Sequence, residues 1–186
     1  GFDVILVETV GVGQGETAVA DMVDFFLVLA LPGAGDELQG IKKGVLELAD
    51  AIAVNKADGD GAARARAALA DMKSALRYLP KKRASWAPRA LAISGLTGAG
   101  LDALWAAVEE HRALLASTGE LATLRSGQQR SWMWSLITER LERAFRADPR
   151  VAARLPGIEA DVVSGRTPAA AAADALLETF GLSRLE

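Results

Sequence analysis

The polar residues that follow one short apolar stretch, Asn55, Lys56 and Asp58, have the types and spacing needed to bind a purine base. The Asp58 carboxylate can accept hydrogen bonds from both the N1–H and the 2-amino group of guanine. Adenine carries an acceptor in place of that ring N–H, so it would leave the carboxylate unpaired and be rejected by about 10⁴-fold or more. The Lys56 stem can lie over the base, and Asn55 can join the neighbouring loops. These residues therefore predict a guanine site.

A second group of candidate residues follows the apolar stretch 3–7. We expect this stretch to be a buried strand that brings Glu8 to the carboxyl edge of a parallel sheet, where such sheets bind ligands. There Glu8 can hold a Mg²⁺-bound water, and the Gly11 amide can approach a terminal phosphate because no side chain blocks it. Gln14 is a candidate for orienting an attacking water, and the alternative is an ordinary position in a glycine-rich loop.

A third group follows residues 89–93, which are also expected to form a buried strand. It consists of Ser94, Gly95 and Leu96, whose backbone N–H groups can face guanine O6 and close the pocket. The three groups occur in an order and with gaps that suit one site at the edge of a parallel sheet. The alternative is three ordinary buried strands that happen to end in polar residues.

The pattern of the whole chain predicts an α/β fold. Residues 24–31 are almost continuously apolar, as in a strand buried on both faces, and strands alternate with helices up to about residue 117. Beyond it only helical periodicity remains, with a long helix expected over about 120–146 and another between Thr167-Pro168 and Gly181. We therefore assign residues 1–117 to part of a nucleotide-binding domain with a parallel sheet and residues 118–186 to a helical extension.

Composition narrows the class of protein further. Of the 186 residues, 51% are hydrophobic and 24% charged, and the net charge of −3 gives no reason to expect nucleic acid or an anionic membrane as a partner. The sequence contains no cysteine, which excludes disulfides and thiolate metal sites. Without a long apolar stretch or a signal peptide, we expect a cytoplasmic protein. Because the chain begins at Gly1, two residues before an expected strand, we expect it to be a fragment.

Four further features have competing interpretations. Residues 98–103 fit a dinucleotide-binding glycine pattern, but without an acidic strand end about 20 residues later they favour a tight turn into a helix. His111 is expected on a solvated helix face, with a catalytic role as the alternative. Lys81–Arg83 are expected in a solvated loop, with phosphate binding as the alternative. Trp132 and Trp134, two residues apart, are expected on different helix faces, one in the core and one available as a dimer anchor.

Longer strings of the sequence resemble the MeaB/ArgK/MMAA family of P-loop GTPases. They are ETVGVGQ (8–14), VADMVD (19–24), LPGAGDELQGIKKG (31–44), ELAD (47–50), NKADGD (55–60) and SGLTGAGLDALW (94–105). The resemblance implies an incomplete GTPase-type parallel sheet with a C-terminal helical extension. It also implies a GTP-hydrolysing chaperone that gates adenosylcobalamin loading of methylmalonyl-CoA mutase and protects the mutase. Such proteins use GTP or GDP with Mg²⁺ and form homodimers through their C-terminal helices.

The same resemblance assigns roles to individual residues. Glu8 would be the acid on the Mg²⁺ side and Gly11 the sensor of the terminal phosphate. The guanine site would consist of Asn55, Lys56, Asp58, Ser94, Gly95 and Leu96. Residues 33–43 resemble a mobile loop that relays the nucleotide state to the mutase. Gly15 departs from the serine expected in the family.

The sequence also lacks an expected part, because it contains no G-x-x-x-x-G-K-[ST] phosphate-binding motif. The resemblance therefore implies that this loop lies upstream of Gly1 and that the chain alone is inactive. Two alternatives remain. One is a GTPase that inserts metal into a metalloenzyme, which would need a cluster of His or Cys ligands. The other is a non-catalytic dimerisation or interaction module.

Overall fold

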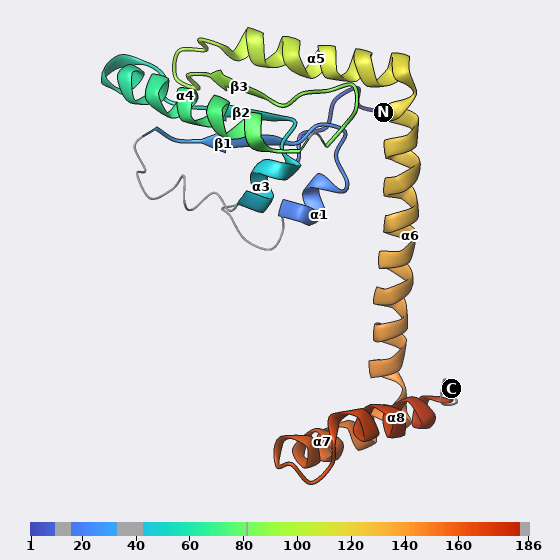
Figure 1. The fold of residues 1–186 in the computed structure, drawn as a ribbon. Helices are drawn as coiled ribbons and strands as arrows, with labels where there is room; N and C mark the ends of the chain where they lie inside the picture. The colour runs from blue at the N-terminus through green and yellow to red at the C-terminus, as the bar shows by residue number, and fades with distance from the viewer. Residues whose placement is uncertain (10–15, 33–42, 81, 183–186) are drawn as a thin grey trace. The chain divides into compact units, whose positions relative to one another are not determined.

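The computed structural model describes residues 1–9, 16–32, 43–80 and 82–182, which belong to two compact units, 1–128 and 129–186 (Figure 1). The first unit alternates helices and strands, as the sequence predicts. Its elements are α1 (Glu16–Ala20), β1 (Leu27–Ala30), α3 (Lys43–Leu48), β2 (Ala51–Val54), η1 (Gly59–Gly61), α4 (Ala62–Tyr78), β3 (Arg89–Ala92), α5 (Leu101–Thr118) and the start of α6 (Glu120–Ala147).

The three strands form one parallel sheet in the order β1-β2-β3. In the register, Ile52 of the central strand lies between Val28 and Ala90. All four residues of β2 are completely buried, which explains why this strand is apolar without alternation. The predicted α/β fold with parallel strands is confirmed.

Helices cover both faces of this sheet (Figure 1). One face packs against α1, α3 and α4 in a core whose buried residues include Ala20, Val28, Val45, Ile52, Val54, Ala65, Met72 and Ala90. The other face packs against α5 in a smaller cluster built on Trp86, Ala107 and Leu115. The sheet thus lies between two helical layers, which leaves its carboxyl edge to the loops that follow the strands.

The first predicted strand is not formed. Residues 1–9 contain no strand pairing, and the side chains of Phe2 and Leu6 are 90% and 88% exposed. A strand needs a hydrogen-bonding neighbour along its edge, and no described strand lies beside this segment. An apolar pattern supplies the tendency to be buried but not the partner, so this prediction from the sequence was wrong for the chain on its own.

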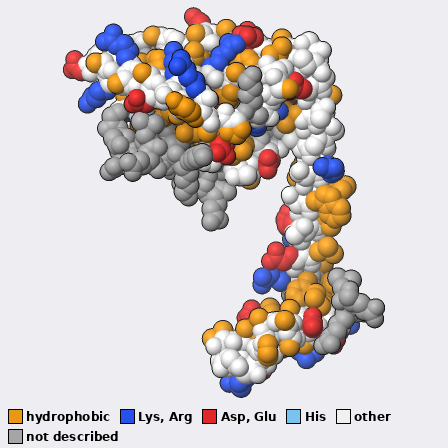
Figure 2. Space-filling view, viewed as in Figure 1, with side chains coloured by type: hydrophobic (Ala, Val, Ile, Leu, Met, Phe, Trp, Pro, Cys, Tyr) orange, Lys and Arg blue, Asp and Glu red, His pale blue; other side chains and the backbone are white. Residues whose placement is uncertain are grey.

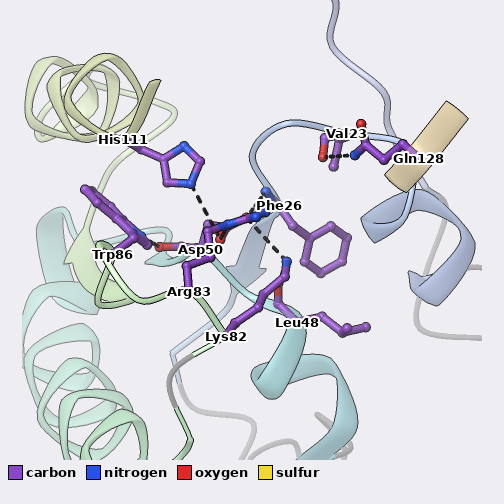
Figure 3. A network of polar contacts seen from close by, with 9 residues as sticks. All are labelled: Val23, Phe26, Leu48, Asp50, Lys82, Arg83, Trp86, His111 and Gln128. Atoms are coloured by element: carbon purple, nitrogen blue, oxygen red, sulfur yellow. Dashed lines mark hydrogen bonds and ion pairs between the residues drawn. The ribbon is translucent and has the colours of Figure 1, made fainter. Parts of the chain in front are cut away.

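At the amino ends of the strands, the buried Asp50 connects its own segment to those before β1 and before β3 (Figure 3). Its Oδ2 accepts a hydrogen bond from the Phe26 amide at 2.9 Å, just before β1. Its backbone oxygen accepts one from Trp86 Nε1 at 2.9 Å, and Arg83 Nε donates to its Oδ1 at 3.4 Å. Lys82 Nζ lies 3.6 Å from Oδ2. Asp50 therefore fixes the starts of β1 and β2 relative to the segment before β3.

The basic loop was predicted to be solvated, and Lys82 is exposed as expected, but Arg83 is only partly exposed and both side chains contact Asp50. Lys81 lies outside the described residues. Lys82 Nζ also donates to the Leu48 carbonyl at 2.7 Å, satisfying an oxygen at the end of α3. Burial is the main cause that lowers the pKa of Lys82. A buried carboxylate such as Asp50 needs nearby cations, and this loop supplies them.

His111 was also placed wrongly by the sequence, because it is buried rather than solvated. Its ring lies edge-on to Phe25 and to Trp86, with 5.0 Å between ring centroids in each case. Its Nε2 lies 3.7 Å from Asp50 Oδ1 and has no hydrogen-bond partner among the described residues. Burial lowers the pKa of His111, and the cations Arg83 and Lys82 act in the same direction, whereas Asp50 and Asp24 act against it.

The second unit consists of the remainder of α6 with α7 (Pro149–Val163) and α8 (Ala169–Phe180). The long helix expected over about 120–146 is confirmed, and α8 ends where Gly181 takes a left-handed conformation with φ 103°. Asp148 begins α7 by accepting hydrogen bonds from the amides of Arg150 and Val151. Its hydrogen bonds with the Arg150 side chain lower the pKa of Asp148 to about 2. Phe145 and Phe180 meet edge to face at 5.3 Å between ring centroids.

Both tryptophans of α6 lie at the surface of this unit, with Trp132 62% and Trp134 60% exposed. The expectation that one of them is a core residue was therefore wrong. Met133, Ile137 and Leu141 on the same helix are exposed as well, and Figure 2 shows hydrophobic side chains along this part of α6. A helix that carries so many large apolar residues outside a core has surface available for a partner.

The turn into α5 provides a matched test of the fold. Gly98 and Gly100 have nearly the same left-handed backbone, with φ 79° and 78°. A Cβ on Gly100 would lie 2.3 Å from the Ala92 carbonyl oxygen, whereas a Cβ on Gly98 would meet no atom within 4 Å. We expect Gly98→Ala to lower the free energy of unfolding by about 1–2 kcal/mol, the cost of the left-handed backbone alone. Gly100→Ala should lower the free energy of unfolding by about 2 kcal/mol more, because the Ala92 backbone must move to make room for the Cβ. Equal losses in urea unfolding would contradict this packing.

His111 should make stability depend on pH. Because its pKa is lowered in the folded chain from a reference value of 6.5, the unfolded chain binds the proton more readily below that pH. The free energy of unfolding should therefore fall as the pH decreases through 6.5 towards the lower folded pKa. His111→Phe keeps an aromatic ring between Phe25 and Trp86 but cannot titrate. Urea unfolding between about pH 5 and 7.5 should show a weaker decline in the variant than in the wild type. An identical decline of the free energy of unfolding in the variant and the wild type would contradict this role of His111.

Candidate functional site

The segment after β2 is held in place by backbone pairing that continues beyond the strand. The Asn55 amide donates to the Ala30 carbonyl at 2.8 Å, and the Ala57 amide donates to the Ile93 carbonyl at 3.0 Å. These bonds connect the segment to the ends of both neighbouring strands. The side chains of Asn55, Lys56 and Asp58 are therefore presented at the carboxyl edge of the sheet, where parallel sheets bind ligands.

The Asn55 side chain joins this segment to the loop after β3. Its Oδ1 accepts hydrogen bonds from the Gly95 amide at 2.9 Å and from the Lys56 amide at 2.8 Å. Lys56 itself has a left-handed backbone with φ 59°, which is uncommon outside glycine. The two contacts that its neighbour Asn55 makes restrain this backbone.

The Asp58 carboxylate is oriented by the third candidate group. Ser94 Oγ donates a hydrogen bond to Asp58 Oδ1 at 2.6 Å and accepts one from the Thr97 amide at 3.1 Å. Ser94 is completely buried, so this hydroxyl is fixed. The other carboxylate oxygen, Oδ2, has no hydrogen-bond donor in the described part of the chain. From the sequence we predicted that the Ser94 backbone contacts a base. That the Ser94 hydroxyl orients Asp58 was not predicted.

These residues line a pocket of about 410 Å³, a size within the range typical of small-molecule sites. The segment after β2 contributes Asn55, Lys56 and Asp58, and the loop after β3 contributes Gly95 and Leu96. The structure therefore brings these five sequence-predicted residues together around one space. The fully buried Ser94 lies behind Asp58.

Three residues of the pocket wall were not predicted, namely Pro32, Gly61 and Arg64. Pro32 follows the strand β1, Gly61 ends η1 just before α4, and Arg64 lies in the first turn of α4. Gly61 can be recognised only from the structure, because a Cβ at this position would lie 2.6 Å from the Lys56 carbonyl oxygen. For Arg64 the sequence offers one indication, since it lies in the first helical turn after the Asp58 loop.

Of the remaining candidate site residues, the structure describes only Glu8. Glu8 is exposed within the segment 1–9, which forms no strand, and it does not line the pocket. Gly11, Gln14 and Gly15, together with most of the 33–43 segment, lie outside the described residues. Within the described ranges, no three acidic or histidine side chains converge as metal ligands. None of the described helices is long and apolar enough to cross a membrane.

Comparison with known proteins places the whole chain among GTPases. A model of the family described as "Methylmalonyl Co-A mutase-associated GTPase MeaB" matches residues 1–150. A putative GTPase from Caulobacter vibrioides is 53% identical over 98% of this chain and 56% of its own length. The mouse "Methylmalonic aciduria type A homolog, mitochondrial" is 43% identical over 97% of this chain and 43% of its own length. The chain thus spans about half the length of the curated relatives it matches.

A solved structure shows the same fold. It is described as a LAO/AO transport system kinase, and it superposes with a TM-score of 0.78 at 34% sequence identity. The match covers 98% of this chain and 58% of the other. Together with the pocket formed after β2 and β3, these similarities show that the chain belongs to the family of methylmalonyl-CoA mutase-associated GTPases, MeaB.

Proposed function

We propose that the pocket after β2 and β3 binds the guanine base of GTP and GDP. The observation that carries this proposal is the Asp58 carboxylate, which Ser94 fixes through one oxygen while the other has no donor among the described residues. Guanine offers two adjacent donors, N1–H and the 2-amino group, to a carboxylate. The Gly95 and Leu96 backbone can face O6, and the Lys56 stem can cover the base. The Asn55 contacts keep these two loops at a fixed separation.

Hydrolysis is proposed for the complete protein rather than for residues 1–186. The described residues supply a pocket for a base, whereas a phosphate-binding G-x-x-x-x-G-K-[ST] motif is missing from this sequence. The candidates for chemistry at the phosphates are Glu8 for the Mg²⁺ side, Gly11 for the terminal phosphate and Gln14 for the attacking water. Glu8 alone of these is described, and it is exposed. Mg²⁺, when bound, would neutralise charge on the phosphates.

We further propose methylmalonyl-CoA mutase as the client and a homodimer as the working state. The family to which the chain belongs is described as associated with that mutase. In such a pairing, GTP binding and hydrolysis would gate adenosylcobalamin loading and protect the mutase, with residues 33–43 relaying the nucleotide state. Support for a dimer comes from the exposed apolar residues of α6, above all Trp132 and Trp134, which have the size and character of interface anchors.

Substituting Asp58 tests the base assignment. In the complete protein, Asp58→Asn should weaken GDP binding by about 100-fold, because an amide nitrogen or a single amide oxygen cannot replace two charge-assisted acceptors. The same variant should gain affinity for XDP, whose base carries an acceptor where guanine carries the 2-amino group. Isothermal titration calorimetry with both nucleotides measures this exchange.

Asp60→Asn is the matched control, because Asp60 lies two residues further along the chain in η1, is exposed and does not line the pocket. It removes the same charge from the same segment and should leave both affinities near those of the wild type. Unchanged GDP affinity in Asp58→Asn, or an equal loss in Asp60→Asn, would contradict the assignment of Asp58 to the guanine base.

A further inference from the structure

Arg64 is a residue of the pocket wall to which the family resemblance assigns no role. It lies in the first turn of α4 and lines the pocket with Gly61. Its side chain is exposed, and no hydrogen bond or ion pair to it is found among the described residues. Arg66, on the same helix, is exposed as well but does not line the pocket. The two arginines thus differ in their access to a ligand in this pocket.

The position of Arg64 is unfavourable for folding. The amino end of a helix carries partial positive charge, so a cation in the first turn is disfavoured there. No acidic residue in the first turn of α4 compensates for it. The first turn of α4 therefore offers this positive charge no acidic partner, and the exposed guanidinium is available to a ligand in the pocket.

The chemistry of the base narrows the choice of ligand atoms. With N1–H and the 2-amino group on Asp58, the next atom along the same edge of guanine is N3, which is an acceptor. The ribose 2′-hydroxyl lies beside N3 in a nucleotide. Asp58 and Arg64 both line the pocket, and the chain between them makes a tight turn in which the Gly61 amide donates to the Asp58 carbonyl at 3.0 Å. A guanidinium carries donors only, so it matches N3 and the 2′-hydroxyl oxygen.

We propose that Arg64 is a specificity-determining residue that donates hydrogen bonds to guanine N3 and to the ribose 2′-hydroxyl. The proposal rests on the guanine site proposed above and adds recognition of the sugar. It makes the pocket selective for ribonucleotides over 2′-deoxyribonucleotides. Asp58 then distinguishes guanine from other bases, while Arg64 distinguishes ribose from deoxyribose.

The test compares GDP with 2′-deoxy-GDP by calorimetry on the complete protein. The wild type should bind GDP about tenfold more tightly than the deoxynucleotide, as expected for one hydrogen bond to a charged donor. Arg64→Ala should weaken GDP binding by more than about tenfold, because the bonds to N3 and to the 2′-hydroxyl are both lost. It should weaken 2′-deoxy-GDP binding only by the smaller factor due to N3, so the ratio of the two affinities should approach one. Arg66→Ala, which removes the same charge from the same helix, should keep both affinities and their ratio.

Thermal unfolding distinguishes ligand recognition by Arg64 from a purely structural role of this residue. Because the charge opposes the helix dipole, Arg64→Ala should leave the midpoint of thermal unfolding unchanged or raise it. Arg64→Lys keeps the charge but loses the planar fork, so it should recover only part of the preference for ribose.

Two outcomes would overturn the proposal. One is an unchanged affinity ratio in Arg64→Ala, which means that both nucleotides lose affinity equally or not at all. The other is an equal effect of Arg66→Ala. If either occurs while Asp58→Asn still abolishes selectivity for guanine, Arg64 alone has been assigned wrongly. If the wild type binds neither nucleotide, the guanine site fails as well.

Discussion

The parallel pairing of β2 with both of its neighbours is the constraint on which the rest of this unit depends. Every residue of the strand is buried, and its backbone hydrogen bonds continue past Val54 through the Asn55 and Ala57 amides. Polar side chains before and after this strand are therefore held by the sheet itself. At one end Asp50 connects β1, the segment before β3 and α5, and at the other Asn55 and Asp58 face the pocket.

The two ends of β2 use carboxylates in different ways. Asp50 is buried with cations and donors on several sides, so its charge is used to connect segments of the fold. Asp58 receives one hydroxyl from the protein and keeps its other oxygen without a donor among the described residues. A carboxylate that is oriented but only half satisfied is suited to binding an external donor pair. The same strand thus carries one structural acid and one acid available to a ligand.

The sequence was sufficient where local pattern decides the structure. The apolar stretches of β2 and β3, the polar residues that follow them, the long α6 and the glycine stop after α8 were all predictable, because each depends on neighbours in the chain. The burial of His111 was not predictable, because the helical pattern around it does not indicate that the Phe25 and Trp86 rings pack against it. Residues 3–7 failed for a related reason, because an apolar pattern does not provide a pairing partner. Pro32 and Gly61 can be assigned to the pocket only from the fold.

The central claim is that the pocket binds guanine through a carboxylate that accepts from two adjacent donors. The most direct measurement is the affinity of the complete protein for GDP and for IDP, since hypoxanthine keeps N1–H and O6 but lacks the 2-amino group. Losing one charge-assisted hydrogen bond should weaken binding by about 10- to 100-fold. Calorimetry should therefore show IDP binding more weakly than GDP by that factor. Equal affinities for the two nucleotides would contradict the account, because Asp58 would then not be paired with the 2-amino group.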